Sequence, residues 1–181
     1  MFKKKFKLVD EKLTLHYDDD NSKYIGFSYN ATISLRRKEE RILELVTTMI
    51  IDDTWLCPQK FCLFLRESTD RRDELVLISH FIKERDAMIL ELIEIKDETL
   101  RNQGLGTIIL TTWLRLLPKY SELYNISFSK IEGTVGEGGN FTSKFAKKLY
   151  RQFNNYKYTQ TQRLKLNKRV LKHGQLEYIL K

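Results

Sequence analysis

The stretch Met88–Trp113 joins a short apolar run, a polar turn with two glycines and a helical pattern. The run Met88–Ile95 is rich in branched aliphatic residues and too short for a helix of its own, which predicts a buried strand. After the turn, apolar residues recur at helical spacing until Pro118, which is expected to end the helix. A strand, a glycine turn and a helix in this order direct backbone N–H groups and the positive end of the helix dipole at one place. The sequence therefore predicts an anion-binding turn.

The spacing of the glycines excludes two common phosphate motifs. A P-loop has a lysine directly after its last glycine, whereas Gly106 is followed by Thr107. A dinucleotide fingerprint has a third glycine where this chain has Ile109. What remains is the pattern Arg-x-x-Gly-x-Gly-Thr, which begins at Arg101. This pattern resembles the pyrophosphate loop of the GNAT superfamily of N-acetyltransferases, which bind acetyl-CoA. The alternative is a turn that only closes a strand against a helix.

The resemblance implies an α+β fold with a mixed, mostly antiparallel central sheet and flanking helices. The chain is expected to form a single domain over residues 1–181, with an atypical N-terminal part at 1–70. It also implies acetyl-CoA as cosubstrate, held where glycine lets the backbone approach a diphosphate and successive N–H groups form an anion nest. The residues expected to bind it here are Ile93, Ile95, Arg101, Asn102, Gln103, Gly104, Leu105, Gly106 and Thr107.

A second segment, in a predicted helix at Phe141–Phe153, is similar to the same family. Its pattern Ser-x-x-Ala-x-x-Leu-Tyr, beginning at Ser143, resembles the family's Asn-x-x-Ala-x-x-Leu-Tyr, with serine in place of asparagine. Ser143 and the nearby Asn140 are candidate cofactor contacts. The resemblance makes Tyr150 the general acid that protonates the departing CoA thiolate; the alternative is a tyrosine that only packs on the sheet.

Transfer to an amine also needs a proton acceptor, because an alkyl amine with a pKa of about 10.4 is mostly protonated at neutral pH. Glu91 and Glu94 lie in the predicted strand, but on opposite sides, so at most one faces the acceptor unless a bulge intervenes. His80 is a third candidate. Any of the three can instead be structural. The chain's histidines show no metal-ligand spacing, and no metal is expected.

The rest of the chain reads as a series of strands around two helices. Apolar alternation and turn residues predict strands at 13–17, 23–35, 60–66, 75–82, 124–131 and 176–180. The first two are expected to form a hairpin. Ile42, Leu45, Val46, Met49 and Ile50 fall on one face of a helix, which predicts a helix over Arg37–Ile51. The strands on either side of the glycine turn are expected to pair in parallel, and residues 133–140 to form a loop.

The composition is that of a globular domain. Of 181 residues, 41% are hydrophobic and 31% charged, and the net charge of +8 suits acidic partners such as CoA phosphates or nucleic acid. No apolar run has the length of a signal peptide or a membrane span, and Cys57 and Cys62 are expected to be free thiols, so a cytoplasmic location is expected.

The predicted function is therefore transfer of the acetyl group of acetyl-CoA to a primary amine, by a monomer or homodimer. The acceptor itself is not encoded in any recognisable motif. Two other functions stay open: a GNAT-like module that binds CoA or a protein without catalysis, and a basic RNA-associated protein. The second rests on charge alone.

Overall fold

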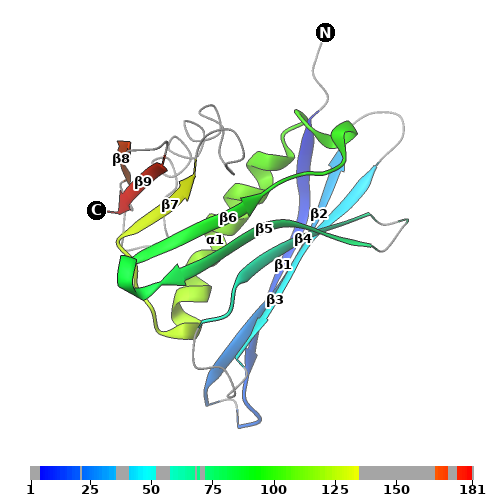
Figure 1. The fold of residues 1–181 in the computed structure, drawn as a ribbon. Helices are drawn as coiled ribbons and strands as arrows, with labels where there is room; N and C mark the ends of the chain where they lie inside the picture. Colours follow the sequence, from blue (N-terminus) through cyan, green and yellow to red (C-terminus); the bar gives the residue numbers. More distant parts are fainter. Residues whose placement is uncertain are drawn as a thin grey trace.

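The strands form one mixed sheet with an α-helix on one face (Figure 1). The computed structural model describes residues 5–20, 22–35, 41–51, 58–67, 69, 72–134, 166–170 and 175–180. The sheet order is β1-β2-β3-β4-β5-β6-β7-β9-β8, and every neighbouring pair is antiparallel except β6 and β7. The elements are β1 (Phe6–Tyr17), β2 (Tyr24–Leu35), β3 (Ile42–Ile50), β4 (Phe61–Glu67), β5 (Asp73–Ile82), η1 (Lys83–Arg85), β6 (Ala87–Ile93), η2 (Glu98–Leu100), α1 (Leu105–Tyr124), β7 (Lys130–Thr134), β8 (Leu166–Val170) and β9 (Gln175–Leu180). The fold is thus α+β with a mixed sheet, as expected.

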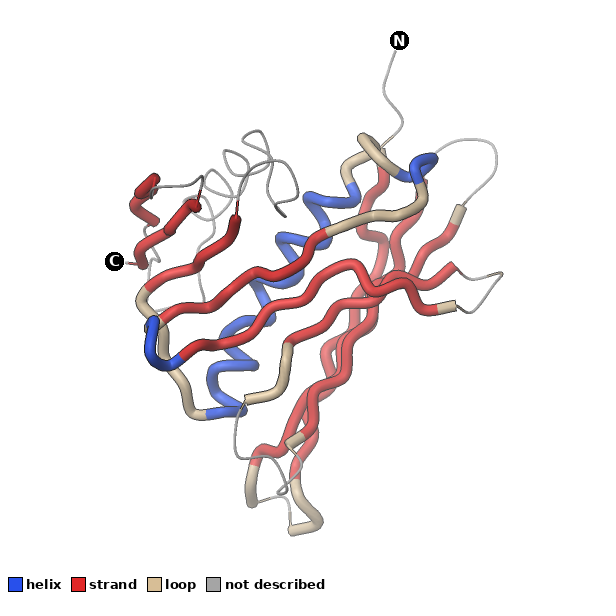
Figure 2. Tube along the Cα trace, in the orientation of Figure 1, coloured by secondary structure: helices blue, strands red, loops and turns tan. Residues whose placement is uncertain are grey.

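The core lies between α1 and one face of the sheet (Figure 2). In β4, Phe61 points to this side, where its ring meets Tyr120 of α1 at 5.8 Å between centroids. In β5, the buried Ser79 hydroxyl accepts a 2.8 Å hydrogen bond from the Trp113 indole of α1. Because side chains alternate along a strand, the neighbours Cys62 and His80 lie on the opposite side. We call that side the far face.

The Trp113–Ser79 hydrogen bond is expected to stabilise the core measurably. Trp113→Phe removes the donor, leaves a buried hydroxyl unpaired and creates a cavity, at a cost of about 2–4 kcal/mol in the free energy of unfolding. Ser79→Ala in the Trp113→Phe background removes the unpaired group and should restore part of that loss, measured by urea denaturation. If the double variant is instead less stable than Trp113→Phe alone, the unpaired hydroxyl is not the source of the loss, and the hydrogen bond contributes nothing to stability.

The helix predicted over Arg37–Ile51 is wrong, since Ile42–Ile50 is strand β3. Its exposure alternates strictly from Leu43 to Ile50, and its β-branched residues suit the pleated sheet better than a helix. The pairing with β2 runs over the whole strand. At Gly26 the two backbones approach so closely that a Cβ atom would lie 2.2 Å from the Met49 carbonyl oxygen. Sheet pairing therefore overrides an apolar spacing that fits a helix equally well.

The expected helix stop at Pro118 is also wrong, because α1 continues to Tyr124. Proline inside a helix removes one backbone hydrogen bond. Here the following turn is held by burial of Tyr120 and Leu123, and Asn125 ends the helix in a left-handed conformation with φ 49°. Consequently the strand predicted at 124–131 begins only at Lys130.

The β1–β2 hairpin is confirmed, although β1 begins at Phe6, seven residues before the predicted start. Strands β4, β5, β6 and β9 are confirmed within a few residues. The parallel pairing of β6 with β7 is confirmed as well. Strand β8 was not predicted, and Gly133 and Thr134 of the predicted loop belong to β7. The predicted helix Phe141–Phe153, with Ser143 and Tyr150, and the neighbouring Asn140 lie outside the described residues. No described helix is long and apolar enough to cross a membrane.

Candidate functional site

The parallel strands β6 and β7 pair only at their start. Ala87, Met88 and Ile89 lie opposite residues 130–132, and the ladder then stops although β6 continues to Ile93 (Figure 1). Within the described part of the chain, residues 90–93 therefore have no strand on the β7 side, while β7 goes on to pair with β9. Unpaired backbone groups along a strand can bind an extended ligand that carries amides.

The chain then enters the segment Arg101–Thr107, which we call the glycine turn. Asn102 and Gly104 have left-handed backbones, with φ 61° and 93°, which direct successive N–H groups to one side. None of the N–H groups from Asn102 to Gly106 donates to an acceptor in the described residues, whereas Thr107 N–H bonds back to Gly104 O at 3.0 Å. These five N–H groups lie at the positive end of the 20-residue helix α1. The turn therefore has the chemistry of an anion site.

The space above the turn is open at the second glycine. A Cβ atom built at Gly106 would meet no atom of the described residues within 4 Å, and at Gly104 the nearest is Phe6 O at 3.9 Å. Neither glycine is thus required by packing, although the positive φ of Gly104 favours glycine there.

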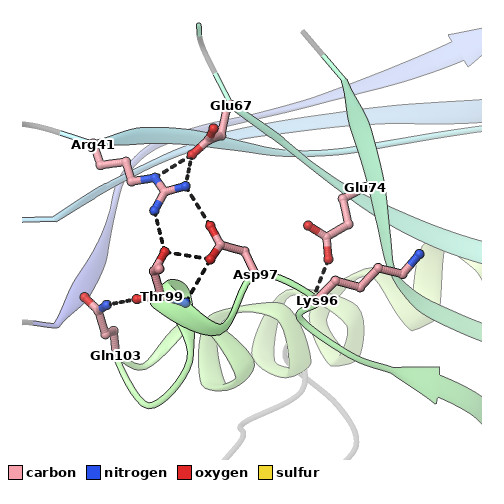
Figure 3. A network of polar contacts seen from close by, with 7 residues as sticks. All are labelled: Arg41, Glu67, Glu74, Lys96, Asp97, Thr99 and Gln103. Atoms are coloured by element: carbon pink, nitrogen blue, oxygen red, sulfur yellow. Dashed lines mark hydrogen bonds and ion pairs between the residues drawn. The ribbon is translucent and has the colours of Figure 1, made fainter. Parts of the chain in front are cut away.

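Arg41 fixes the approach to the glycine turn (Figure 3). Its guanidinium donates to Asp97 Oδ2 at 2.8 Å and to Thr99 Oγ1 at 2.9 Å, and it also binds the Glu67 carboxylate at the end of β4. The Thr99 hydroxyl hydrogen bond, with those from Thr99 N–H and Arg41, holds the pKa of Asp97 below its ordinary value. One cation thus ties the end of β4 to the segment that leads into the glycine turn.

Contacts with the preceding segment and with β1 also hold the glycine turn. Arg101 donates to Ile95 O at 2.8 Å, to Lys96 O at 3.3 Å and to Glu98 Oε1 at 3.2 Å, so its guanidinium closes the segment that precedes it. Gln103 O accepts a 2.8 Å hydrogen bond from Phe6 N–H at the start of β1. Binding of phosphate by Arg101 stays a prediction, and these contacts give Arg101 a structural role in addition.

Arg41→Ala is expected to loosen the glycine turn without unfolding the protein. Loss of its hydrogen bond should raise the pKa of Asp97 part of the way to its ordinary value, because the Thr99 hydrogen bonds remain. Amide hydrogen exchange at residues 99–101, whose N–H groups bond Asp97 and Glu98, should rise by about fivefold or more. Arg66→Ala, which removes a guanidinium paired with Asp73 instead, is the matched control. Unchanged exchange and an unchanged Asp97 titration would contradict this role.

Glu91 lies in a β-bulge of β6, in the part of this strand that no longer pairs with β7. Ile78 pairs with Leu92 and Ser79 with Leu90, so Glu91 has no opposite residue in β5. Its carboxylate accepts from Lys60 Nζ at 2.8 and 3.0 Å, and Oε1 lies 3.2 Å from His80 Nδ1. The last contact lacks hydrogen-bond geometry, so this buried nitrogen has no hydrogen-bond partner in the described residues. Lys60, His80 and Glu91 form what we call the polar cluster, on the far face.

The structure separates the two candidate carboxylates. Glu94 lies beyond the end of β6 and is exposed, and its N–H bonds Val76 O at 3.0 Å. Glu91 instead lies with His80, which pairs with Ile89, the last residue before the strands diverge. Ile93 and Ile95 pack against the core. If these two residues contact a cofactor, as predicted, they would therefore do so through their backbone groups more than through their side chains.

Sequence reasoning missed Arg41 and Lys60. Arg41 lies 56 residues before Asp97, and Lys60 lies 31 residues before Glu91. No local pattern marks such pairs, which become visible only with the strand register. Burial raises the pKa of the Cys62 thiol, which lies close enough to the polar cluster for the charges of Lys60 and Glu91 to act on it.

Comparisons of the chain with models of known protein families, with curated proteins and with solved structures found no match.

Proposed function

We propose that this protein is a GNAT-like N-acetyltransferase that moves the acetyl group of acetyl-CoA to a primary amine. The observation that carries the proposal is the order of two features along one stretch of chain. Among the described residues, strand β6 has no partner on the β7 side after Ile89, and the glycine turn follows with five N–H groups that have no acceptor there. The second of these features, the glycine turn, is the segment whose residues resemble the family's pyrophosphate loop.

Acetyl-CoA carries matching groups in the same order. Its pantetheine arm is extended and contains two amides, which can hydrogen bond to the unpaired edge at residues 90–93 as an added strand would. Its diphosphate is an anion that suits the glycine turn and the positive end of α1. The thioester at the other end of the arm would then lie toward Ile89, where the strands converge and His80 is the neighbour across the sheet.

The reaction needs a proton acceptor beside that point. The amine nitrogen attacks the thioester carbonyl carbon, the nitrogen–carbon bond forms, the carbon–sulfur bond breaks, and the ammonium proton leaves. In this proposal Glu91, with His80 beside it, takes this proton, and its contact with Lys60 balances the carboxylate charge. Tyr150 is expected to protonate the thiolate by the resemblance alone.

Titration calorimetry with CoA fragments tests the proposal. Acetyl-CoA and CoA are expected to bind, and pantetheine, which lacks the diphosphate, to bind at least about tenfold more weakly. Release of free thiol in the presence of a panel of primary amines then tests transfer. Binding without thiol release from any amine would favour the non-catalytic CoA-binding module, and no binding of CoA would refute both.

A further inference from the structure

The far face carries a groove of about 470 Å³ that crosses strands β1 to β5. This volume is in the range of sites that hold a small molecule. Residues that lie opposite each other on paired strands share a face, so the strand register arranges the lining side chains in rows across the sheet. One row runs from Thr14 through Ser28 to Thr48, and the next runs from Lys12 through Asn30 and Val46 to Phe64.

The end of the groove on β1 and β2 is a cluster of free hydrogen-bond donors. Lys12 lies directly opposite Asn30, and Thr14 is the next residue of β1 on the same face. All three are exposed, and their side chains have no hydrogen-bond or ion-pair partner in the part of the chain that the structure describes. An ammonium, a carboxamide N–H and a hydroxyl can all donate to one anion. This end of the groove therefore suits a negatively charged group.

The charge of the lining agrees with an anionic ligand. Lys12 and Arg66 contribute two positive charges and Asp73 one negative charge, a formal sum of +1. Arg66 holds Asp73 through two hydrogen bonds of 2.7 and 3.1 Å, which leaves Lys12 as the lining cation without an acidic partner among the described residues. The same pair occupies the Asp73 carboxylate, which argues against a cationic ligand. An apolar ligand would leave the donors on β1 and β2 without partners.

The middle of the groove presents a hydrogen-bond acceptor. Thr48 Oγ1 donates to Ser28 Oγ at 3.3 Å, and Ser28 Oγ lies 2.7 Å from His16 Nε2. Because its proton is engaged with Ser28, the Thr48 oxygen offers its lone pairs to the groove. This position suits a ligand hydroxyl, which donates to that oxygen.

Phe64 gives the other end of the groove an aromatic surface. Its side chain is half-buried, and Val46, directly opposite on β3, lies between it and Asn30. Asn30 and Phe64 are two strands apart, which is about 10 Å at a spacing of about 4.8 Å between strands. A flat base stacks well on such a ring. A single nucleotide can cover this span from its phosphate to its base.

From this order of donors, acceptor and ring we infer that the groove binds a nucleoside monophosphate as a free small molecule. The phosphate lies among Lys12, Thr14 and Asn30, a ribose hydroxyl donates to Thr48, and the base stacks on Phe64. One unpaired cation suits one phosphate, whereas a nucleic-acid strand is held by a row of cations along its backbone.

This site is separate from the proposed acetyl transfer. Phe64 lies opposite Leu75, which is five residues along β5 from His80 of the polar cluster. The glycine turn, where the diphosphate of acetyl-CoA is proposed to bind, follows β6 and lies outside the groove lining. The inference therefore goes beyond the proposed function and does not depend on it.

Calorimetry with the full chain compares AMP with adenosine, which lacks only the phosphate. The wild type is expected to bind AMP about tenfold more tightly, the effect of a hydrogen bond to a charged group. Lys12→Met keeps the length of the side chain but removes the ammonium, and should reduce this preference to about threefold or less. Lys7→Met is the matched control, because Lys7 is exposed on the same face of β1 and does not line the groove. It should keep the wild-type preference.

Phe64→Leu tests the other end of the groove. Loss of the ring removes the stacking surface and should weaken AMP and adenosine alike, by about fivefold or more. The preference for AMP over adenosine should stay as in the wild type, because the donors at Lys12 are unchanged. Thermal unfolding shows whether this half-buried position tolerates leucine, and Lys12→Met, a change at an exposed position, tests the site in either case.

Four outcomes overturn the inference. AMP does not bind, or Lys7→Met and Lys12→Met lose the preference equally, which shows only a general attraction between charges. AMP binding is lost in Gly106→Val and kept in Lys12→Met, which places AMP on the glycine turn. A single-stranded oligonucleotide binds more tightly than AMP and loses affinity in Lys12→Met, which assigns the groove to a nucleic-acid strand. The expected AMP preference in a protein that does not bind acetyl-CoA supports the groove and refutes the proposed function alone.

Discussion

A Gly106→Val variant is expected to fold like the wild type and to lose acetyl-CoA affinity by at least about 100-fold, or about 2.7 kcal/mol. Gly106 is the second residue of α1, and the space where its Cβ would lie is open in the described residues. Valine is no worse than glycine inside a helix, so the fold should tolerate the change. The added methyl groups would occupy the space in front of the unpaired N–H groups, where the diphosphate is proposed to lie. Calorimetry with CoA and thermal unfolding measure the two effects separately.

Two further variants control this experiment. Gly106→Ala adds one methyl group instead of three carbons and should give an intermediate loss. Thr111→Val places the same valine side chain on α1 but beyond the glycine turn, where it removes only a hydrogen bond to Thr107 O, and should bind CoA normally. Gly104→Val is a poorer test, because a φ of 93° makes any side chain there strained. Wild-type affinity in a folded Gly106→Val protein would remove the diphosphate from the turn.

The sequence was most informative where structure is local. The apolar run at β6, the glycine turn and the start of α1 follow from residues next to one another, and the structure contains all three. Helix α1 could be followed only to Pro118, because the burial that carries it to Tyr124 comes from the sheet. Strand β3 could not be distinguished from a helix for the same reason. Its apolar spacing fits the period of a helix as well as that of a strand, and its long pairing with β2 makes it a strand.

In the candidate site, too, the local features were predictable from the sequence and the contacts between distant strands were not. The glycine turn was predictable, because residue types that favour the left-handed backbone, Asn102 and Gly104, mark it locally. Its anchor Arg41 and the partner of Glu91, Lys60, were not, since both come from distant strands. The alternation of side chains along a regular strand puts Glu91 and Glu94 on opposite sides, but it could not show which of the two lies beside the unpaired part of β6. The bulge at Glu91 breaks that alternation, and bulges have no reliable sequence signal.

Glu91→Gln is expected to lower kcat by about 10²- to 10⁴-fold while acetyl-CoA affinity stays nearly unchanged, once an accepted amine is identified. Glutamine keeps the shape of the side chain but cannot take a proton. The proton that Glu91 takes comes from the amine and not from acetyl-CoA, so the loss belongs in kcat and not in cofactor binding. Rates must be measured under conditions in which chemistry limits turnover.

Glu94→Gln is the matched control, with the same change three residues later on an exposed carboxylate outside the polar cluster. It should keep kcat within about threefold of the wild type, the range of surface substitutions away from a site. His80→Gln tests whether the two groups act together: if Glu91 and His80 handle the same proton, the double variant loses less than the product of the single losses. Losses that multiply would assign them separate roles. A large loss in Glu94→Gln with wild-type kcat in Glu91→Gln would move the base out of the bulge to the end of β6, and the polar cluster would then serve only to hold the strands together.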